Sequence, residues 1–176
     1  MTPIIDNCTI GDNVTIDAGC MMYQSVIGNN CFLPFRAGLY LTTLMENVIV
    51  SQNTCLQMCV IGRNSFVGAG NTFTDFNLIA QKPIRVTNQD GELEPLNQIV
   101  MGSAVGHNCR IGSGMIVMPG RMIESDVVLI ASPQRRVIGR TVTFEESDHH
   151  FVRGGDVHQR FYRREDEETP VEEEQW

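Results

Sequence analysis

The chain has 176 residues, a formal net charge of −8 and 42% hydrophobic residues, which suits one soluble domain with a sizeable core. No apolar run approaches the roughly 18 residues of a membrane span, and the start lacks the basic and apolar regions of an export signal, so a cytoplasmic protein without a membrane span is expected. Residues 141–176 hold eleven acidic and four basic residues, and no basic face for nucleic acid is evident. We therefore expect no nucleic-acid partner.

From the N-terminus onwards, mostly aliphatic residues recur at every sixth position, apart from slips of five residues after Met22 and four after Met45. The predicted ladder comprises Ile4, Ile10, Ile16, Met22, Ile27, Leu33, Leu39, Met45, Ile49, Cys55, Ile61, Val67 and Phe73, and then Ile99, Val105, Ile111, Val117, Ile123 and Leu129. This period fits neither a helix nor the alternation of a long strand. Five of the six cysteines lie two positions before a ladder residue, in a slot of compact residues, and we expect all six to be reduced and interior.

Four related strings follow the ladder: "IGDNVTI", "IGNNCFL", "IGRNSFV" and "VGHNCRI". Glycine directly after an aliphatic residue suits a turn, and asparagine tolerates the left-handed backbone region better than most residues. Each six-residue unit then reads as a short strand plus a turn, and three units make one triangular coil. The pattern predicts an all-β protein of about six coils, stacked at roughly 4.8 Å.

These repeats resemble the hexapeptide-repeat, left-handed β-helix family. The resemblance covers about residues 4–129 and implies a single-stranded left-handed β-helix, which we place at residues 1–140. It also implies a homotrimer. The fold alone does not determine the function.

A long inserted loop is predicted at residues 74–98, where the ladder stops and two prolines and a "QDG" turn signal occur. Two interpretations stay open. The loop either packs against something, such as a neighbouring subunit, or is a decorative insertion. Beyond Leu129 the pattern decays, and residues 141–176 are predicted to be an acidic C-terminal extension that is disordered at its end.

The third position of the four strings holds Asp12, Asn29, Arg63 and His107. The structural interpretation is that the scaffold accepts any polar residue there and that His107 is a fourth filler. Counting along the ladder places Ala69 and Ser125 beside His107 in the neighbouring coils, which would leave the imidazole room for a ligand.

The stretch "AVGHNCRIGSGMIVMPGRMI" resembles the segment that carries the catalytic histidine in hexapeptide acyltransferases of lipid A synthesis and in acetyltransferases acting on amino-sugar nucleotides and sialic acid. The resemblance implies that His107 is a general base. It would deprotonate a hydroxyl or amine of a sugar or sugar-nucleotide acceptor as that group attacks an acyl thioester. Ladder counting makes Glu124 and Asp126 the nearest acids that could orient the ring.

The same resemblance implies acyl-CoA as co-substrate. Lys82 and Arg85 on the insertion, and Arg135 and Arg136 near the end of the β-helix, are candidates to bind its phosphates. No metal is expected, since the group Asp148, His149, His150, Asp156 and His158 reads as a solvated segment.

Two other functions compete with the acyltransferase. The alternative is a non-catalytic, trimerising β-helix domain of a sugar nucleotidyltransferase-like protein. A γ-class carbonic anhydrase needs three histidines on zinc, and His107 is the only histidine within the ladder.

Overall fold

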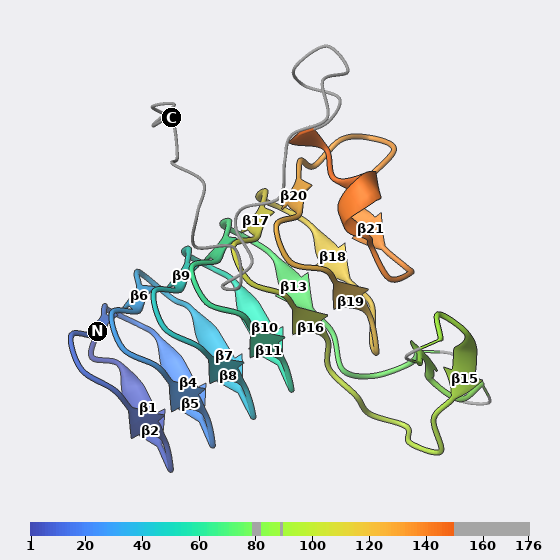
Figure 1. Cartoon of the computed structure of the whole chain (residues 1–176). Helices are drawn as coiled ribbons and strands as arrows, with labels where there is room; N and C mark the ends of the chain where they lie inside the picture. Colours follow the sequence, from blue (N-terminus) through green and yellow to red (C-terminus); the bar gives the residue numbers. More distant parts are fainter. Residues whose placement is uncertain (79–81, 89, 150–176) are drawn as a thin grey trace, which may run out of the picture.

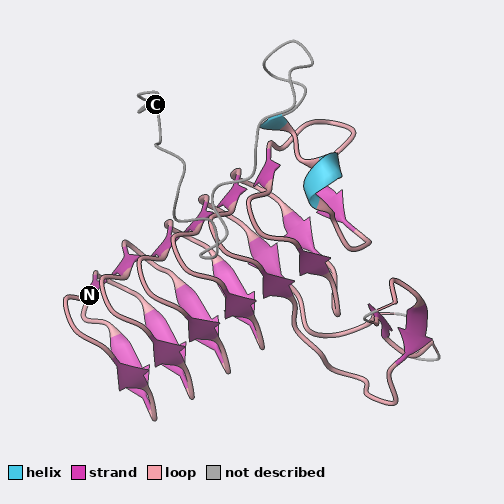
Figure 2. Ribbon diagram, viewed as in Figure 1, coloured by secondary structure: helices cyan, strands magenta, loops and turns pink. Residues whose placement is uncertain are grey.

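The computed structural model describes residues 1–78, 82–88 and 90–149. The chain winds into a stack of triangular coils whose strands run in parallel on three faces (Figures 1 and 2). The predicted all-β class is confirmed, and a short 3₁₀ turn lies near the end of the described residues. The acidic end at residues 150–176 lies outside the described residues, and so do His150, Asp156 and His158.

Three parallel sheets form the faces, here called A, B and C. Face A consists of β1 (Ile4–Asp6), β4 (Met21–Tyr23), β7 (Gly38–Tyr40), β10 (Cys55–Gln57), β13 (Thr72–Phe73), β18 (Ile116–Val117) and β21 (Val137–Ile138). Face B consists of β2 (Thr9–Ile10), β5 (Val26–Ile27), β8 (Thr43–Leu44), β11 (Val60–Ile61), β16 (Ala104–Val105) and β19 (Met122–Ile123). Face C consists of β3 (Thr15–Ile16), β6 (Phe32–Leu33), β9 (Ile49–Val50), β12 (Phe66–Val67), β17 (Arg110–Ile111) and β20 (Val128–Leu129). The expected six coils agree with these six or seven strands per face.

Each of the early coils has 17 residues and not 18. Met22 pairs with Ile5 and Leu39, and Ile27 pairs with Ile10 and Leu44, always 17 positions apart. The missing residue is at the corner between faces A and B, where interior positions are five residues apart.

This short corner corrects part of the predicted ladder. Interior positions are held by Ile5, Leu44, Val50 and Leu56, each one residue away from the predicted Ile4, Met45, Ile49 and Cys55. In the early coils, successive interior positions are five, six and six residues apart. A count in steps of six cannot follow this spacing, and the predicted positions therefore fall one residue away from the interior ones.

The core is a single column of aliphatic side chains inside the triangle. All six cysteines are free, as predicted; Cys20, Cys31, Cys59 and Cys109 are buried, whereas Cys8 and Cys55 are partly exposed. Burial raises the pKa of the Cys59 thiol to about 12. The buried cysteines therefore act as compact core residues.

The corner glycines serve close packing between coils. A Cβ added at Gly62 would lie 2.4 Å from the carbonyl carbon of Gly106 in the next coil. The left-handed backbone is found two residues later, at Asn64 (φ 56°) and its equivalents. The glycine allows backbone contact, and the asparagine makes the turn.

The insertion leaves the prism after β13 and forms a small antiparallel hairpin of β14 (Arg85–Thr87) and β15 (Leu93–Pro95). The prism resumes at β16, and Ile99, which the sequence placed in the ladder, is 70% exposed. Ile84 is buried, with its methyl group close to Gly120. The hairpin therefore packs on its own prism.

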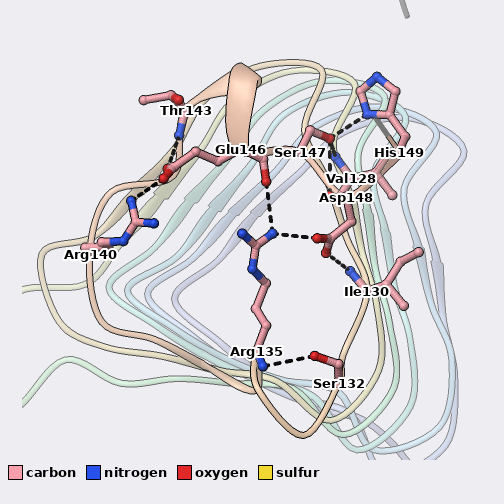
Figure 3. A network of polar contacts seen from close by, with 10 residues as sticks. All are labelled: Val128, Ile130, Ser132, Arg135, Arg140, Thr143, Glu146, Ser147, Asp148 and His149. Atoms are coloured by element: carbon pink, nitrogen blue, oxygen red, sulfur yellow. Dashed lines mark hydrogen bonds and ion pairs between the residues drawn. The ribbon is translucent and has the colours of Figure 1, made fainter. Parts of the chain in front are cut away.

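A cap closes the C-terminal end of the prism (Figure 3). Residues 140–149, which carry the 3₁₀ turn η1 (Phe144–Glu146), fold back over the last coil, and Phe144 and Val142 are buried there. The Arg135 guanidinium bonds the Asp148 carboxylate (2.7 Å) and the Glu146 carbonyl (2.9 Å). The other Asp148 oxygen accepts the Ile130 N–H at 2.6 Å.

Charge pairing holds the cap closed. Arg140 forms an ion pair with Glu146, whose carboxylate also accepts the Thr143 N–H. Burial acts to raise the pKa of Glu146, but the hydrogen bonds from Arg140 and Thr143 outweigh it, and the pKa stays below its ordinary value. Within the part of the chain that the structure describes, no helix is long and apolar enough to span a membrane.

Gly62→Ala should destabilise the protein, because its Cβ meets backbone atoms that cannot move aside. We expect a cost of about 2 kcal/mol, within the range for overpacking, and a melting temperature lower by about 5 °C. Gly139→Ala is the matched control, since a Cβ there meets nothing within 4 Å. Equal melting temperatures for the two variants would refute the close-packing role.

Glu146→Gln tests the cap through its pH dependence. A carboxyl whose pKa is lowered on folding stabilises the protein above its unfolded pKa, and this stabilisation is lost as the pH falls through the folded pKa. The wild type should have a higher melting temperature than the variant at pH 7. This difference in melting temperature should disappear as the pH falls from about 5 to about 3. Glu92→Gln on the hairpin is the control. A gap that widens in acid would contradict the assignment.

Candidate functional site

His107 lies at the corner between faces B and C, directly after β16. Its Nδ1 accepts the backbone N–H of Arg63 in the preceding coil at 3.0 Å. Its own backbone N–H donates to Ser125 Oγ in the following coil, also at 3.0 Å. The ring is partly buried.

The same contact recurs at other coils with other side chains. Asn29 Oδ1 accepts the Asp12 N–H at 2.7 Å, and at the next corner Ser113 Oγ accepts the Ala69 N–H at 3.1 Å. A side chain in each of these coils thus satisfies a backbone N–H of the coil before it. The scaffold does not ignore this position, because it uses a hydrogen-bond acceptor there.

The predicted neighbours of His107 are half right. Ser125 is in the following coil as expected, but Arg63 and not Ala69 is in the preceding coil. Ala69 is the partner of Ser113 instead. The ladder count across the insertion shifted the register by one corner, because Ile99 is not a ladder position.

The contact from Arg63 determines which tautomer of His107 is neutral. A backbone N–H can only donate, so Nδ1 must carry a lone pair and the proton of a neutral ring lies on Nε2. In this arrangement Nε2 is a hydrogen-bond donor. Among the described residues no hydrogen bond engages Nε2, which leaves it available to a ligand.

The acids nearest to His107 by ladder counting have other partners. Asp126 Oδ1 accepts the Asn108 side-chain amide at 2.9 Å and continues a column of corner asparagines. Glu124 Oε2 accepts the Phe144 N–H of the cap at 3.0 Å. The side chain of Arg63 turns away to Glu46, at 2.7 Å. These contacts hold the corner in shape around the imidazole.

A shallow hollow of about 450 Å³ adjoins the same corner on face C. Ile49 and Phe66 give it apolar walls, and Asn47, Asn64, Ser65 and Arg110 complete its lining. Arg110 is held by hydrogen bonds to the carbonyls of Asn64 (2.5 Å) and Cys109 (3.0 Å). Ladder counting could not find this hollow, because it is formed by outward side chains of three separate coils.

The four basic residues proposed for phosphate binding lie in two places. Lys82 and Arg85 are on the insertion, where Arg85 Nη2 donates to the Leu93 carbonyl. Arg135 and Arg136 precede β21; Arg135 is part of the cap, and Arg136 Nε donates to the Gly114 carbonyl at 3.1 Å. No hydrogen bond of the described residues joins one pair to the other. Nor do those residues contain a His, Cys, Asp and Glu cluster suited to a metal.

The chain was compared with families and structures of known proteins. A family model described as the GMPPB C-terminal domain matches residues 4–89, from β1 to just beyond β14. No curated protein matches the sequence at a significant level. The three-faced coil of short parallel strands therefore has the fold of the hexapeptide-repeat, left-handed β-helix proteins.

Solved structures share the fold at low identity. WeeI from Acinetobacter baumannii AYE is 14% identical with a TM-score of 0.51, over 74% of this chain and 52% of that chain. A mutant of perosamine N-acetyltransferase from Caulobacter crescentus, in complex with CoA and GDP-perosamine, is 16% identical with a TM-score of 0.41, over 74% and 51%. UDP-N-acetylglucosamine acyltransferase from Campylobacter jejuni is 16% identical with a TM-score of 0.41, over 80% and 66%. The chain spans about half the length of the first two.

Substitutions at His107 should separate its structural contact from any chemistry. His107→Asn keeps an acceptor for the Arg63 N–H, as Asn29 does in its own coil, so its melting temperature should stay within about 2 °C of the wild type. His107→Ala removes the acceptor and should cost about 1 kcal/mol, or roughly 3 °C. Asn29→Ala is the matched control for loss of the same contact. If the Ala and Asn variants melt alike, the contact carries no stability.

Proposed function

We propose that the chain is an acyltransferase that moves an acyl group from acyl-CoA to a hydroxyl or amine of a sugar or sugar nucleotide, with His107 at the reacting centre. The observation that carries the proposal is the imidazole itself. It is partly exposed and held at Nδ1 by Arg63, and no hydrogen bond of the described residues engages its Nε2. The resemblance of the segment around His107 to the acyltransferase histidine segment supports the substrate class.

The reaction needs one proton to leave the acceptor and one to reach the departing thiolate. The acceptor O–H or N–H attacks the thioester carbonyl, the C–S bond breaks, and CoA leaves as a thiol. His107 as general base takes the acceptor proton and returns it to the sulfur. A base at Nε2 requires the proton on Nδ1, so the Arg63 N–H must lose its acceptor when substrate binds. Catalytic hydrogen bonds often reach their final geometry only in the substrate complex.

In the arrangement described, His107 donates from Nε2. A donor at this point would stabilise the oxyanion that forms on the thioester carbonyl. We assign the base role to His107 after the tautomer changes, and the donor role to Nε2 once it has taken the acceptor proton.

A homotrimer in a reducing, cytoplasmic setting is part of the proposal. Each face has outward apolar residues, such as Val26 on face B, Phe32 on face C and Ile116 on face A, and all three are exposed in the single chain. Burial between subunits would remove this surface from water. Six free thiols suit a reducing compartment. Light scattering that gives a monomer mass at micromolar concentration would reject the trimer.

A second candidate is a non-catalytic β-helix domain that trimerises a sugar nucleotidyltransferase-like protein. Two observations favour it. The Nδ1 contact of His107 repeats what Asn29 and Ser113 do, so the residue has a structural use without any chemistry. The match to the GMPPB C-terminal domain points the same way.

Turnover by His107→Asn distinguishes the two candidates. We expect acyl transfer to amino-sugar nucleotides to fall at least about 10²-fold, while binding of acyl-CoA measured by calorimetry is retained. Asn29→Ala, which alters the equivalent contact three coils away, should keep full activity. Unchanged turnover in His107→Asn removes the catalytic role. A wild type that binds and turns over no acyl-CoA favours the assembly domain.

A further inference from the structure

Arg121 occupies a slot that the rest of its column reserves for small residues. It precedes β19, and Ala104 of β16 donates to its carbonyl at 3.0 Å, so it stands above Ser103 in the stack. The same slot holds Ser25, Thr42 and Cys59 in earlier coils, and all of these are buried. This exception is visible in the sequence, because Arg121 is the one long cationic residue that occupies the position two before a ladder residue of face B.

The Arg121 side chain is partly buried and has no counter-charge among the described residues. Its Nε is buried and finds no acceptor among the described residues. None of the three ion pairs formed by those residues includes Arg121. Burial lowers the pKa of this guanidinium. A cation taken out of water without a paired anion is costly, and proteins keep such groups where an anion completes them.

The insertion hairpin forms one wall of this corner. Ile84 and Val86 flank Gly120, the residue before Arg121, and the Arg85 carbonyl lies 3.3 Å from where a Gly120 Cβ would be. Thr87 Oγ1 contacts Thr141 Oγ1 at 2.9 Å, which joins the hairpin to the last coil. The hairpin thus covers the corner with Ile84 and Val86, while the exposed Arg85 side chain lies on the other face of the strand, where its Nη2 donates to the Leu93 carbonyl.

We propose that Arg121, beside the insertion hairpin, forms a binding site for the diphosphate of a nucleotide ligand. A guanidinium offers its Nε and Nη edge to two oxygens at once, which suits phosphate geometry. Arg121 precedes a face B strand, β19, whereas His107 follows a face B strand, β16, so the two residues lie at opposite ends of the strands of face B. The proposed diphosphate site does not depend on acyl transfer, because diphosphate binding requires no turnover.

Titration calorimetry with inorganic pyrophosphate tests the site in the full chain. The wild type should bind pyrophosphate, and Arg121→Met, which keeps the aliphatic stem, should weaken binding at least about 10-fold. Arg121→Lys should retain part of the affinity. Arg36→Gln is the control for loss of one positive charge, because Arg36 lies over the Phe35 ring near the other end of the prism. It should bind like the wild type.

Thermal melting separates ligand binding from a merely structural arginine. Arg121→Met should melt higher than the wild type without ligand, since it removes an unpaired, partly buried cation, and pyrophosphate should raise the melting temperature of the wild type only. A structural role gives the opposite sign, with the variant melting lower. Absence of pyrophosphate binding by the wild type at millimolar concentration, or equal binding by Arg121→Met, overturns the proposal.

The same titrations with UDP, GDP and CoA identify the source of the diphosphate. Loss of UDP or GDP binding in Arg121→Met assigns the site to the nucleotide of the acceptor. Loss of CoA binding alone assigns it to the acyl donor. Either result supports a diphosphate site, and both leave the role of His107 to its own test.

Discussion

Backbone pairing between successive coils is the constraint on which the rest of the molecule depends. Each strand is hydrogen-bonded to the strand one coil earlier and one coil later, and the coils are held about 4.8 Å apart along the whole prism. At the corners this spacing leaves no volume for a Cβ at Gly62 or Gly106. It also leaves corner N–H groups that point at the neighbouring coil, and these require an acceptor.

The candidate histidine takes part in this constraint. His107 accepts the Arg63 N–H as Asn29 accepts that of Asp12, so a residue proposed for chemistry is at the same time a support of the corner. This double use has a chemical consequence. The tautomer that supports the corner is a donor at Nε2, and the tautomer that serves as a base gives that support up. Any catalysis by His107 is therefore coupled to the geometry of Arg63.

The two interruptions of the repeat meet at one corner of the prism. The hairpin after β13 packs on Gly120, and the cap that follows β21 contacts the hairpin through Thr87 and Thr141. Both elements lie outside the hexapeptide pattern, and they meet near Gly120, the residue before Arg121, the large cation in a slot of small residues. The two segments that interrupt the repeat thus lie near the one slot of this column that holds a large residue. A site at which several local rules are broken together is where ligand binding is expected.

The sequence by itself determined the architecture, because a period near six with compact residues and asparagine corners has only one compact solution. It also identified His107, the interior cysteines and the place where the insertion leaves the ladder. Tertiary structure decided the register, since the five-residue corner between faces A and B shifts the interior positions from Ile49 and Cys55 to Val50 and Leu56. It alone decided what surrounds His107 and Arg121. The neighbours of His107 come from coils 18 and 44 residues away, and only closing each coil on the last brings them into contact.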